Sequence, residues 1–129
     1  MIVGVGTDIF SISRLAPIAD DLQDPFFKKS FTEKEQKQAS ERPDPLFYYA
    51  TCFAGKEAVY KAISGCGCGF VASDIEVLGL EYGRPAATIS GSTADMVRGH
   101  VGSDVAIHVS LSFEEDYAVA VALAETKPD

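Results

Sequence analysis

The segment from Asp44 to Ser64 constrains the fold more than any other part of the sequence. Asp44 suits the N-cap of a helix, and Pro45 suits its first helical position. The apolar residues that follow share one helical face: Phe47, Ala50, Ala54, Ala58 and Ile63, with Phe53 at the border. Small residues at positions 54, 55 and 58 let another element approach closely. We expect one long helix here, and it is the strongest helix prediction in the chain.

Glu57 and Lys61 lie four residues apart in this helix and therefore share one of its faces. The run then breaks into Gly65, Gly67 and Gly69. One interpretation is an exposed ion pair followed by a helix stop and a flexible connector. The other is a carboxylate and an ammonium group that hold a divalent metal and a phosphate beside exposed backbone N–H groups. The glycine-rich loop is not a P-loop, since no Gly-Lys-Ser/Thr follows it.

The first half of the chain also predicts a strand and shorter helices. Residues 2–10 form a short β-branched run typical of a buried strand, and Asp8 lies near its end. A carboxylate there must cap a turn or bind something cationic, because burying it unpaired is costly. Residues 11–22 predict a helix with Ser11 or Ser13 as cap, and residues 25–31 a loop or short helix. Thr32 and Glu35 match a capping box that opens a polar helix ending near residues 42–43.

The second half predicts mainly strands. Residues 74–82 and 86–90 form the two arms of a hairpin joined by a turn at 83–85. Residues 92–100 predict a short helix capped by Ser92 or Thr93. Residues 105–112 alternate strictly between apolar and other side chains, which predicts a strand paired with residues 117–124. His108 lies on the polar side of this strand and has no acid beside it in the sequence.

Length and composition indicate one globular domain over residues 1–129. The hydrophobic fraction is 47%, and no apolar run approaches the roughly 18–20 residues that span a bilayer. The N-terminal segment has no basic region and carries an early acid, so it does not match a signal peptide. The count of three cysteines is odd, which favours free thiols. We therefore expect a cytoplasmic protein that does not enter the membrane.

The charge distribution bears on possible partners. The net charge of −8 argues against non-specific binding to nucleic acid. However, eight of the eleven basic residues fall between Arg14 and Lys61. The first half of the chain can therefore still meet an anionic partner.

Asp8 and Glu57 are the two acids best placed to bind a metal ion directly. Two carboxylates, with waters and phosphate oxygens, are what Mg²⁺ usually receives in a phosphoryl-transfer site. Lys61, one turn after Glu57, would contact the phosphate as a point charge. The spacing alone does not show that Asp8 meets Glu57.

Five motifs occur in one order along the chain: GVGTDIFSISRL at 4–15, FTEKE at 31–35, FAGKEAVYKAI at 53–63, DIEVLGLEYGRP at 74–85 and HVSLS at 108–112. Together they resemble the holo-acyl-carrier-protein synthase family of 4′-phosphopantetheinyl transferases. The resemblance covers nearly the whole chain, and the pairing of GxGTDI with F-A-x-K-E-A-x-x-K is specific to that family.

The resemblance implies an α+β fold, mainly an antiparallel sheet packed on a long central helix, in a homotrimer with active sites at subunit interfaces. It implies coenzyme A as donor and Mg²⁺ as cofactor, with a serine of an acyl carrier protein attacking the β-phosphate and 3′,5′-ADP leaving. The residues carried over by motif are Asp8 and Glu57 for the metal; Lys61 for phosphate; Gly65, Gly67, Gly83, Arg84 and Pro85 for coenzyme A; and Arg14, Lys28, Lys29 and Lys34 for the acidic carrier.

Two positions depart from the family pattern. The family commonly has Arg before F-A-x-K-E-A and His after S-L-S, where this chain has Cys52 and Phe113. Both family residues lie near the coenzyme A phosphates, so their loss can weaken coenzyme A binding by about a few kcal/mol. The alternatives are an active transferase and a non-catalytic paralogue that binds coenzyme A or a carrier protein; an unrelated Mg²⁺-dependent phosphohydrolase fits the motif order poorly. The carrier, its pathway and the general base stay open.

Overall fold

A computed structural model describes residues 1–18, 21–79 and 84–128 of the chain. Its five strands form one antiparallel sheet in the order β1-β5-β4-β3-β2. The strands are β1 (Ile2–Ser11), β2 (Ile75–Leu78), β3 (Ala86–Ile89), β4 (Val105–Glu114) and β5 (Tyr117–Thr126). The predicted α+β class with a mainly antiparallel sheet is confirmed.

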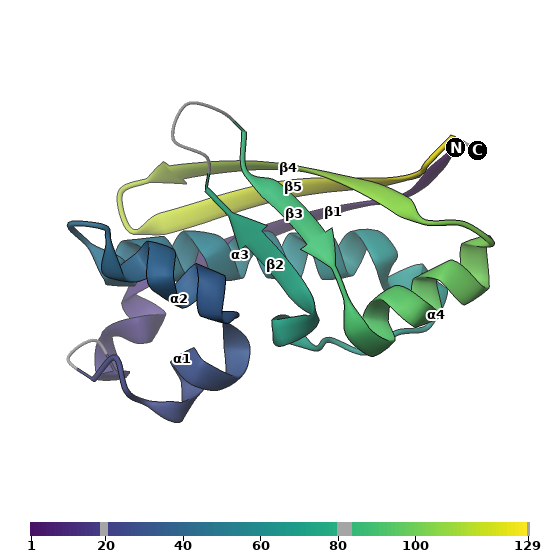
Figure 1. The fold of residues 1–129 in the computed structure, drawn as a ribbon. Helices are drawn as coiled ribbons and strands as arrows, with labels where there is room; N and C mark the ends of the chain where they lie inside the picture. The colour runs from purple at the N-terminus through teal and green to yellow at the C-terminus, as the bar shows by residue number, and fades with distance from the viewer. Residues whose placement is uncertain (19–20, 80–83, 129) are drawn as a thin grey trace.

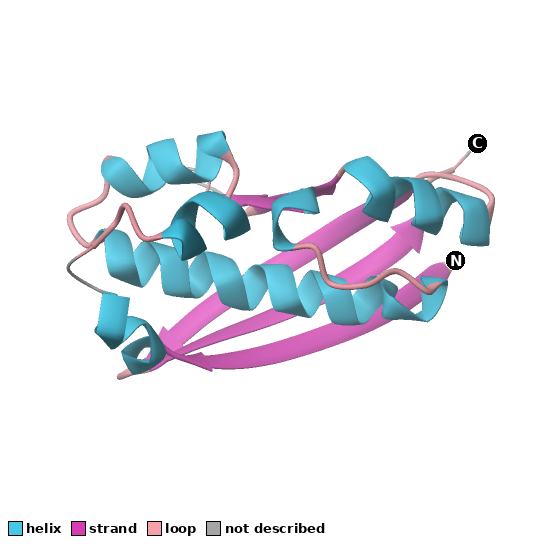
Figure 2. Cartoon of the chain, turned by 90° about the horizontal axis from the view of Figure 1, so that it is seen from below, coloured by secondary structure: helices cyan, strands magenta, loops and turns pink. Residues whose placement is uncertain are grey.

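The α-helices of the described residues lie on one face of this sheet (Figure 1). They are α1 (Pro25–Ser30), α2 (Glu33–Ser40), α3 (Pro45–Ile63) and α4 (Gly91–Val101), with short 3₁₀ helices at Ile12–Ile18, Ser64–Cys66 and Ala72–Asp74. Seen from below, α3 runs along the long strands, with α1 and α2 near one end and α4 near the other (Figure 2). The long central helix is thus confirmed. None of the helices in the described part of the chain has the length and apolarity needed to cross a membrane.

Local capping sets where α2 and α3 begin, as the sequence predicts. The Asp44 side chain accepts a hydrogen bond from the Phe47 amide at 3.1 Å, and Pro45 occupies the first turn of α3. The Thr32 hydroxyl accepts from the Glu35 amide, while the Glu35 carboxylate accepts from the Thr32 amide. These bonds satisfy backbone donors that a helix start leaves unpaired.

Close contact between β1 and α3 depends on two glycines. A Cβ at Gly4 would overlap the Ala62 carbonyl oxygen, and one at Gly6 would overlap the Ala58 carbonyl oxygen. The neighbouring strand β5 contributes only small side chains to this layer, namely the fully buried Ala118, Ala120, Ala122 and Ala124. The sheet can therefore press against the helix backbone, and this fixes where Asp8 lies relative to α3.

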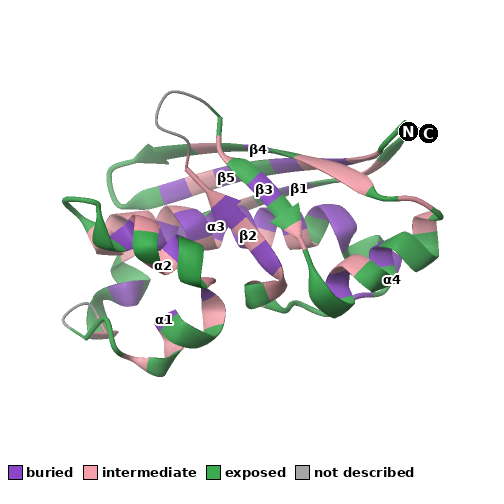
Figure 3. Ribbon diagram, viewed as in Figure 1, coloured by how far each residue is buried: buried purple, intermediate pink, exposed green. Residues whose placement is uncertain are grey.

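The α3 helix is buried on more than the single face that the sequence predicts. Figure 3 shows buried residues along most of its length. The sheet covers one side, while α2 and the segment leading into β2 cover another, where Tyr49, Cys52, Lys56 and Val59 are buried. The one-face pattern was incomplete because two separate layers pack on the same helix.

Four local predictions need correction. The helix predicted over 11–22 is a 3₁₀ helix that ends at Ile18; Pro17 lies inside it, where the missing N–H prevents an α-helix. The predicted loop at 65–69 begins as a 3₁₀ turn. The first hairpin arm ends at Leu78, and residues 80–82 lie outside the described residues. The α4 helix begins at Gly91 with Ser90 as N-cap residue, so neither predicted cap occupies that position.

Candidate functional site

The fold brings Asp8, Glu57 and Lys61 together where β1 crosses α3. Asp8 lies on the face of β1 that also carries Gly6, so its carboxylate points toward the helix. The Lys61 amine lies 3.2 Å from Asp8 Oδ1 and donates to the Thr7 carbonyl oxygen at 2.9 Å. The Asp8 side chain is 8% exposed, whereas that of Lys61 is 53% exposed. The lysine therefore closes the solvent side of a largely buried carboxylate.

The Glu57 carboxyl group lies beside that of Asp8. Partial burial and the neighbouring Asp8 carboxyl group raise the pKa of Glu57 to about 7, against the opposing charges of Arg14 and Lys61. Among the described residues, Asp8 Oδ2 is buried and has no hydrogen-bond partner. Two crowded carboxylates and an unpartnered oxygen are the arrangement that a bound cation relieves.

The chemistry of this donor set fits Mg²⁺. Mg²⁺ prefers hard oxygen ligands and is commonly held by one or two carboxylates together with waters and substrate phosphates. The described residues contain no group of three or more His, Cys, Asp or Glu arranged to hold a metal alone. The pair Asp8 and Glu57 therefore suits a metal that shares its coordination with a phosphorylated substrate.

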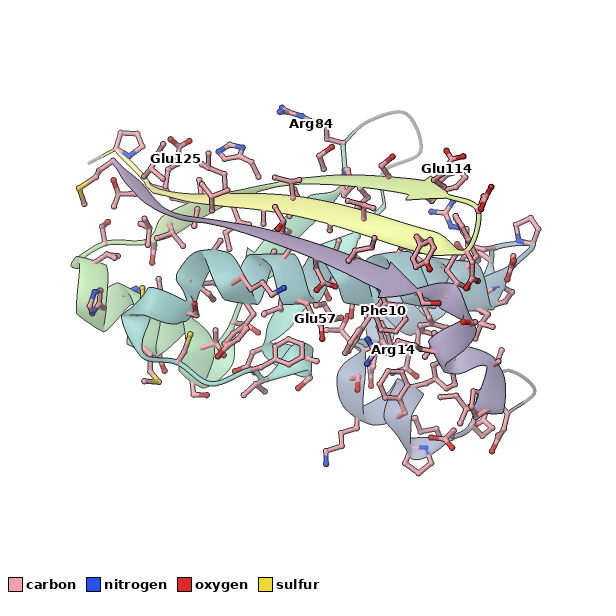
Figure 4. The ribbon with its side chains drawn as sticks, turned by 180° about the vertical axis from the view of Figure 1, so that it is seen from behind. Phe10, Arg14, Glu57, Arg84, Glu114 and Glu125 are labelled. Carbon is pink, nitrogen blue, oxygen red and sulfur yellow. The ribbon has the colours of Figure 1, made fainter. Side chains whose placement is uncertain are left out.

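Arg14 lies at the rim of the same site. It belongs to the 3₁₀ helix after β1, and its guanidinium carbon is 4.6 Å from the centre of the Phe10 ring. Figure 4 shows Arg14, Phe10 and Glu57 close together on the helix side of the sheet. Lys28 and Lys29 are exposed in the last turn of α1. Arg14 is exposed, and its position beside Glu57 was not foreseen from the sequence.

Other predicted site residues lie elsewhere. Arg84 and Pro85 line a cavity of about 360 Å³ with Ile107, His108 and Val109. Arg84 and Glu57 lie on opposite sides of the sheet (Figure 4). Gly83 lies outside the described residues.

Gly65 and Gly67 lie just beyond the C-terminal end of α3, and both are exposed. Gly67 adopts a left-handed conformation with φ of 85°. One chain therefore assembles the acidic pair and Lys61 but does not bring Arg84 to them.

Sequence reasoning missed a buried ion pair between Glu35 and Lys56. Both side chains are 0% exposed, and the Lys56 amine lies 2.7 Å from Glu35 Oε1. The amine also donates to the Ala72 carbonyl at 2.9 Å and to the Ile75 carbonyl. Glu35 Oε2 accepts from the Val77 amide at 2.7 Å. This pair ties α3 to α2 and to the segment before β2, and only the lysine's place among apolar neighbours could have suggested it.

Cys52 belongs to the same buried network. Its thiol is 3.1 Å from Glu35 Oε2, and the residue is 2% exposed. Burial and the neighbouring carboxylate raise the pKa of the Cys52 thiol well above its usual value. Cys52 is therefore a packed residue on a buried face of α3.

His108 and Phe113 also gain partners that the sequence did not indicate. His108 Nε2 lies 2.8 Å from Glu125 Oε1 on the neighbouring strand, although no acid lies beside His108 in the sequence. Phe113 packs edge-on against Phe47 with ring centres 4.8 Å apart. Long-range strand and helix contacts create both pairs.

Comparison with known protein families identifies the family of this chain. The model of the 4′-phosphopantetheinyl transferase superfamily matches residues 4–122. The chain therefore belongs to the 4′-phosphopantetheinyl transferase superfamily.

Individual proteins of known class are similar to this chain in sequence or in structure. A holo-[acyl-carrier-protein] synthase from Magnetococcus marinus is 41% identical over 132 residues, which cover 99% of this chain and 96% of the relative. The acyl carrier protein synthase of Mycobacterium tuberculosis has a similar structure, with a TM-score of 0.74 and 36% identity over 98% of this chain and 100% of the other. A holo-(acyl-carrier-protein) synthase from Bacillus anthracis in complex with CoA (3′,5′-ADP) has a TM-score of 0.71 and 29% identity, covering 98% and 99% of the two chains.

Proposed function

We propose that this protein is a holo-[acyl-carrier-protein] synthase. It transfers the 4′-phosphopantetheine group of coenzyme A to a serine of an apo acyl carrier protein. The serine oxygen forms a bond to the β-phosphorus, the bond from that phosphorus to the leaving phosphate breaks, and 3′,5′-ADP and the serine proton are released. The observation that carries the proposal is the Asp8–Glu57 pair with its unpartnered oxygen beside Lys61. The synthases among the relatives and the structure in complex with CoA support it.

Asp8 and Glu57 are the residues proposed to hold Mg²⁺, which when bound neutralises phosphate charge during transfer. Lys61 is proposed to exchange its contact with Asp8 for a phosphate oxygen. Its exposed ammonium is held near the site by the Thr7 carbonyl, so the move is short. Phosphoryl transfer depends mainly on positioning and charge stabilisation, which these three side chains can supply.

The carrier is proposed to dock beside this site. Arg14 in the 3₁₀ helix after β1, and Lys28 and Lys29 in α1, are exposed cations to which an acidic carrier is complementary. Arg14 lies nearest to Glu57, so an acid bound there would place the carrier against the reacting groups. This explains how a chain of net charge −8 can receive an acidic partner.

The coenzyme A site is proposed to include Arg84 and Pro85, with Gly83, Gly65 and Gly67. Because Arg84 lies across the sheet from Glu57 in one chain, the complete site requires a second copy. The outer face of β1 and β5 supports this: Val5, Ile9 and Val121 are exposed there with no helix over them in the described residues. An apolar sheet face of this kind is typical of a protein interface. We therefore propose a homotrimer with shared sites.

Two broader proposals follow from the same assignment. Residues 1–129 are proposed to form a single transferase domain. The protein is proposed to work in the cytoplasm, where Cys52, Cys66 and Cys68 stay reduced.

One assay tests the transferase. The protein is incubated with coenzyme A, Mg²⁺ and apo carrier proteins, and the carrier is weighed by mass spectrometry. We expect a mass gain of one phosphopantetheine group, and Glu57→Gln should abolish it while the fold is retained by circular dichroism. Coenzyme A binding without any gain on any carrier would instead identify a non-catalytic paralogue.

Light scattering tests the trimer. Ile9→Arg should yield monomers, because a charge would then lie in the apolar interface. Met96→Arg, on exposed α4, is the matched control and should leave the mass unchanged. A monomeric wild-type protein would refute the shared site.

A further inference from the structure

The Phe10 ring holds the Arg14 guanidinium in a defined place. Phe10 is 2% exposed and lies two residues after Asp8, on the same face of β1. The Phe53 ring packs edge-on against it, with centres 5.3 Å apart. The ring is therefore buried in the core, and the guanidinium carbon of Arg14 lies over it, 4.6 Å from its centre. Stacking of this kind is a cation–π interaction.

Within residues 1–18, 21–79 and 84–128, no group accepts a hydrogen bond from the Arg14 guanidinium. Among the described residues, Arg14 forms no ion pair, although it lies near enough to Glu57 for its charge to act on that carboxyl group. Stacking occupies the face of a guanidinium and leaves its N–H groups at the edge. Because Arg14 is exposed, the edge of its guanidinium is open to an anion that approaches from solvent.

We infer that Phe10 is a positioning residue that orients Arg14 to receive a carboxylate of the carrier protein next to the Asp8–Glu57 pair. This inference rests on the proposed transferase function. An unrestrained arginine at a surface samples many rotamers and loses that freedom on binding. The Phe10 ring restricts the rotamers of Arg14 before the carrier binds, so Arg14 loses less conformational entropy on binding. Phe10 thereby couples the buried core to the docking point of the carrier.

The expected loss of carrier affinity on removal of the Phe10 ring follows from the exposure of Arg14. Cation–π pairs at exposed sites are worth about 0.5–1 kcal/mol, which corresponds to roughly a two- to fivefold change in affinity. We expect Phe10→Met to weaken carrier binding by that factor, because methionine keeps most of the volume but has no aromatic face. The dissociation constant of coenzyme A should not change, since in the described part of the chain the Phe10 ring packs on Phe53 and Arg14 and not on Lys61, Arg84 or Pro85.

The test uses full-length protein and calorimetric titration with an apo carrier and, separately, with coenzyme A. Phe53→Met is the matched control, because Phe53 packs on Phe10, whereas Arg14 lies over the Phe10 ring. It removes an aromatic ring from the same cluster and should leave carrier affinity within a factor of about 1.5. Phe10→Tyr retains an aromatic face and should bind the carrier nearly as well as wild type.

A double-mutant cycle separates positioning from general loss of packing. If Phe10 acts through Arg14, Phe10→Met should have no further effect on carrier affinity in an Arg14→Ala background. Equal effects in both backgrounds, or equal losses in Phe10→Met and Phe53→Met, would overturn the inference. Loss of coenzyme A affinity in Phe10→Met would also overturn it. Wild-type protein that binds the carrier without transferring the group would refute the transferase proposal but leave this test intact.

Discussion

Replacement of Lys56 by methionine tests whether the buried ion pair holds the layers around α3 together. Lys56 and Glu35 are both 0% exposed, and the amine uses its three protons on Glu35 and on the carbonyls of Ala72 and Ile75. Methionine fills similar space but removes the charge and all three donors. The Glu35 carboxylate would then remain buried with only the Thr32 and Val77 amides and a thiol as partners.

The expected cost is large because the remaining charge has no counter-charge. Removing one partner of a buried ion pair typically costs about 3–5 kcal/mol. Proteins of this size are stable by only about 5–15 kcal/mol, so Lys56→Met should lose roughly a fifth or more of the free energy of unfolding. Adding Glu35→Gln removes the unpaired charge and should recover about half of the loss, since replacing both charges of a buried pair is far less costly than removing one.

Urea unfolding followed by circular dichroism measures these differences at fixed protein concentration, because self-association would contribute to stability. Arg98→Met is the matched control. Its side chain is 55% exposed and pairs with Asp104, which is 57% exposed, so its loss should cost less than about 1 kcal/mol. A cost below about 1 kcal/mol for Lys56→Met, or no recovery in the double variant, would refute the reasoning.

Three further predictions follow. In the presence of a chelator, the free energy of unfolding should fall by about 1–2 kcal/mol between pH 5 and pH 8, after allowance for solvent screening. The sign follows because the folded-state pKa of Glu57 is raised to about 7, so its contribution is present at low pH and is lost as pH rises through 7; added Mg²⁺ or Glu57→Gln should abolish the fall. Gly6→Ala should cost about 1–3 kcal/mol in urea unfolding and weaken Mg²⁺ binding, because the new Cβ forces β1 away from Ala58. Asp74→Ala should cost about 1–2 kcal/mol, since its carboxylate accepts from the amide and hydroxyl of Thr93 at the start of α4; an unchanged melting temperature would contradict this role.

Signals confined to a few neighbouring residues predicted much of the fold. Asp44 and Pro45 define the start of α3, and Thr32 with Glu35 defines the start of α2, because capping depends on residues within one turn. The alternation at 105–112 likewise reports a strand with one buried side. These features need no information about distant parts of the chain.

Features that depend on distant residues could not be predicted in the same way. The start of α4 is stabilised by Asp74, which lies 19 residues before Thr93. The burial of Lys56 depends on α2 and on the carbonyls before β2, and the pairing of His108 with Glu125 depends on strand register. For the site, the sequence pointed to Asp8 and Glu57 separately, and only the close packing allowed by Gly6 brings them together.

The adjacent residues Lys56 and Glu57 explain why the Glu57 carboxylate points from α3 toward β1. Successive residues on an α-helix point about 100° apart, so the two side chains leave α3 toward different layers. Lys56 is locked toward α2 and the segment before β2, which fixes the rotation of the helix about its axis. Gly6 fixes the distance to β1 on the other side. Because the rotation of α3 and its distance from β1 are both fixed, Glu57 faces Asp8. The fold itself therefore holds the two carboxylates side by side, although their repulsion is unfavourable.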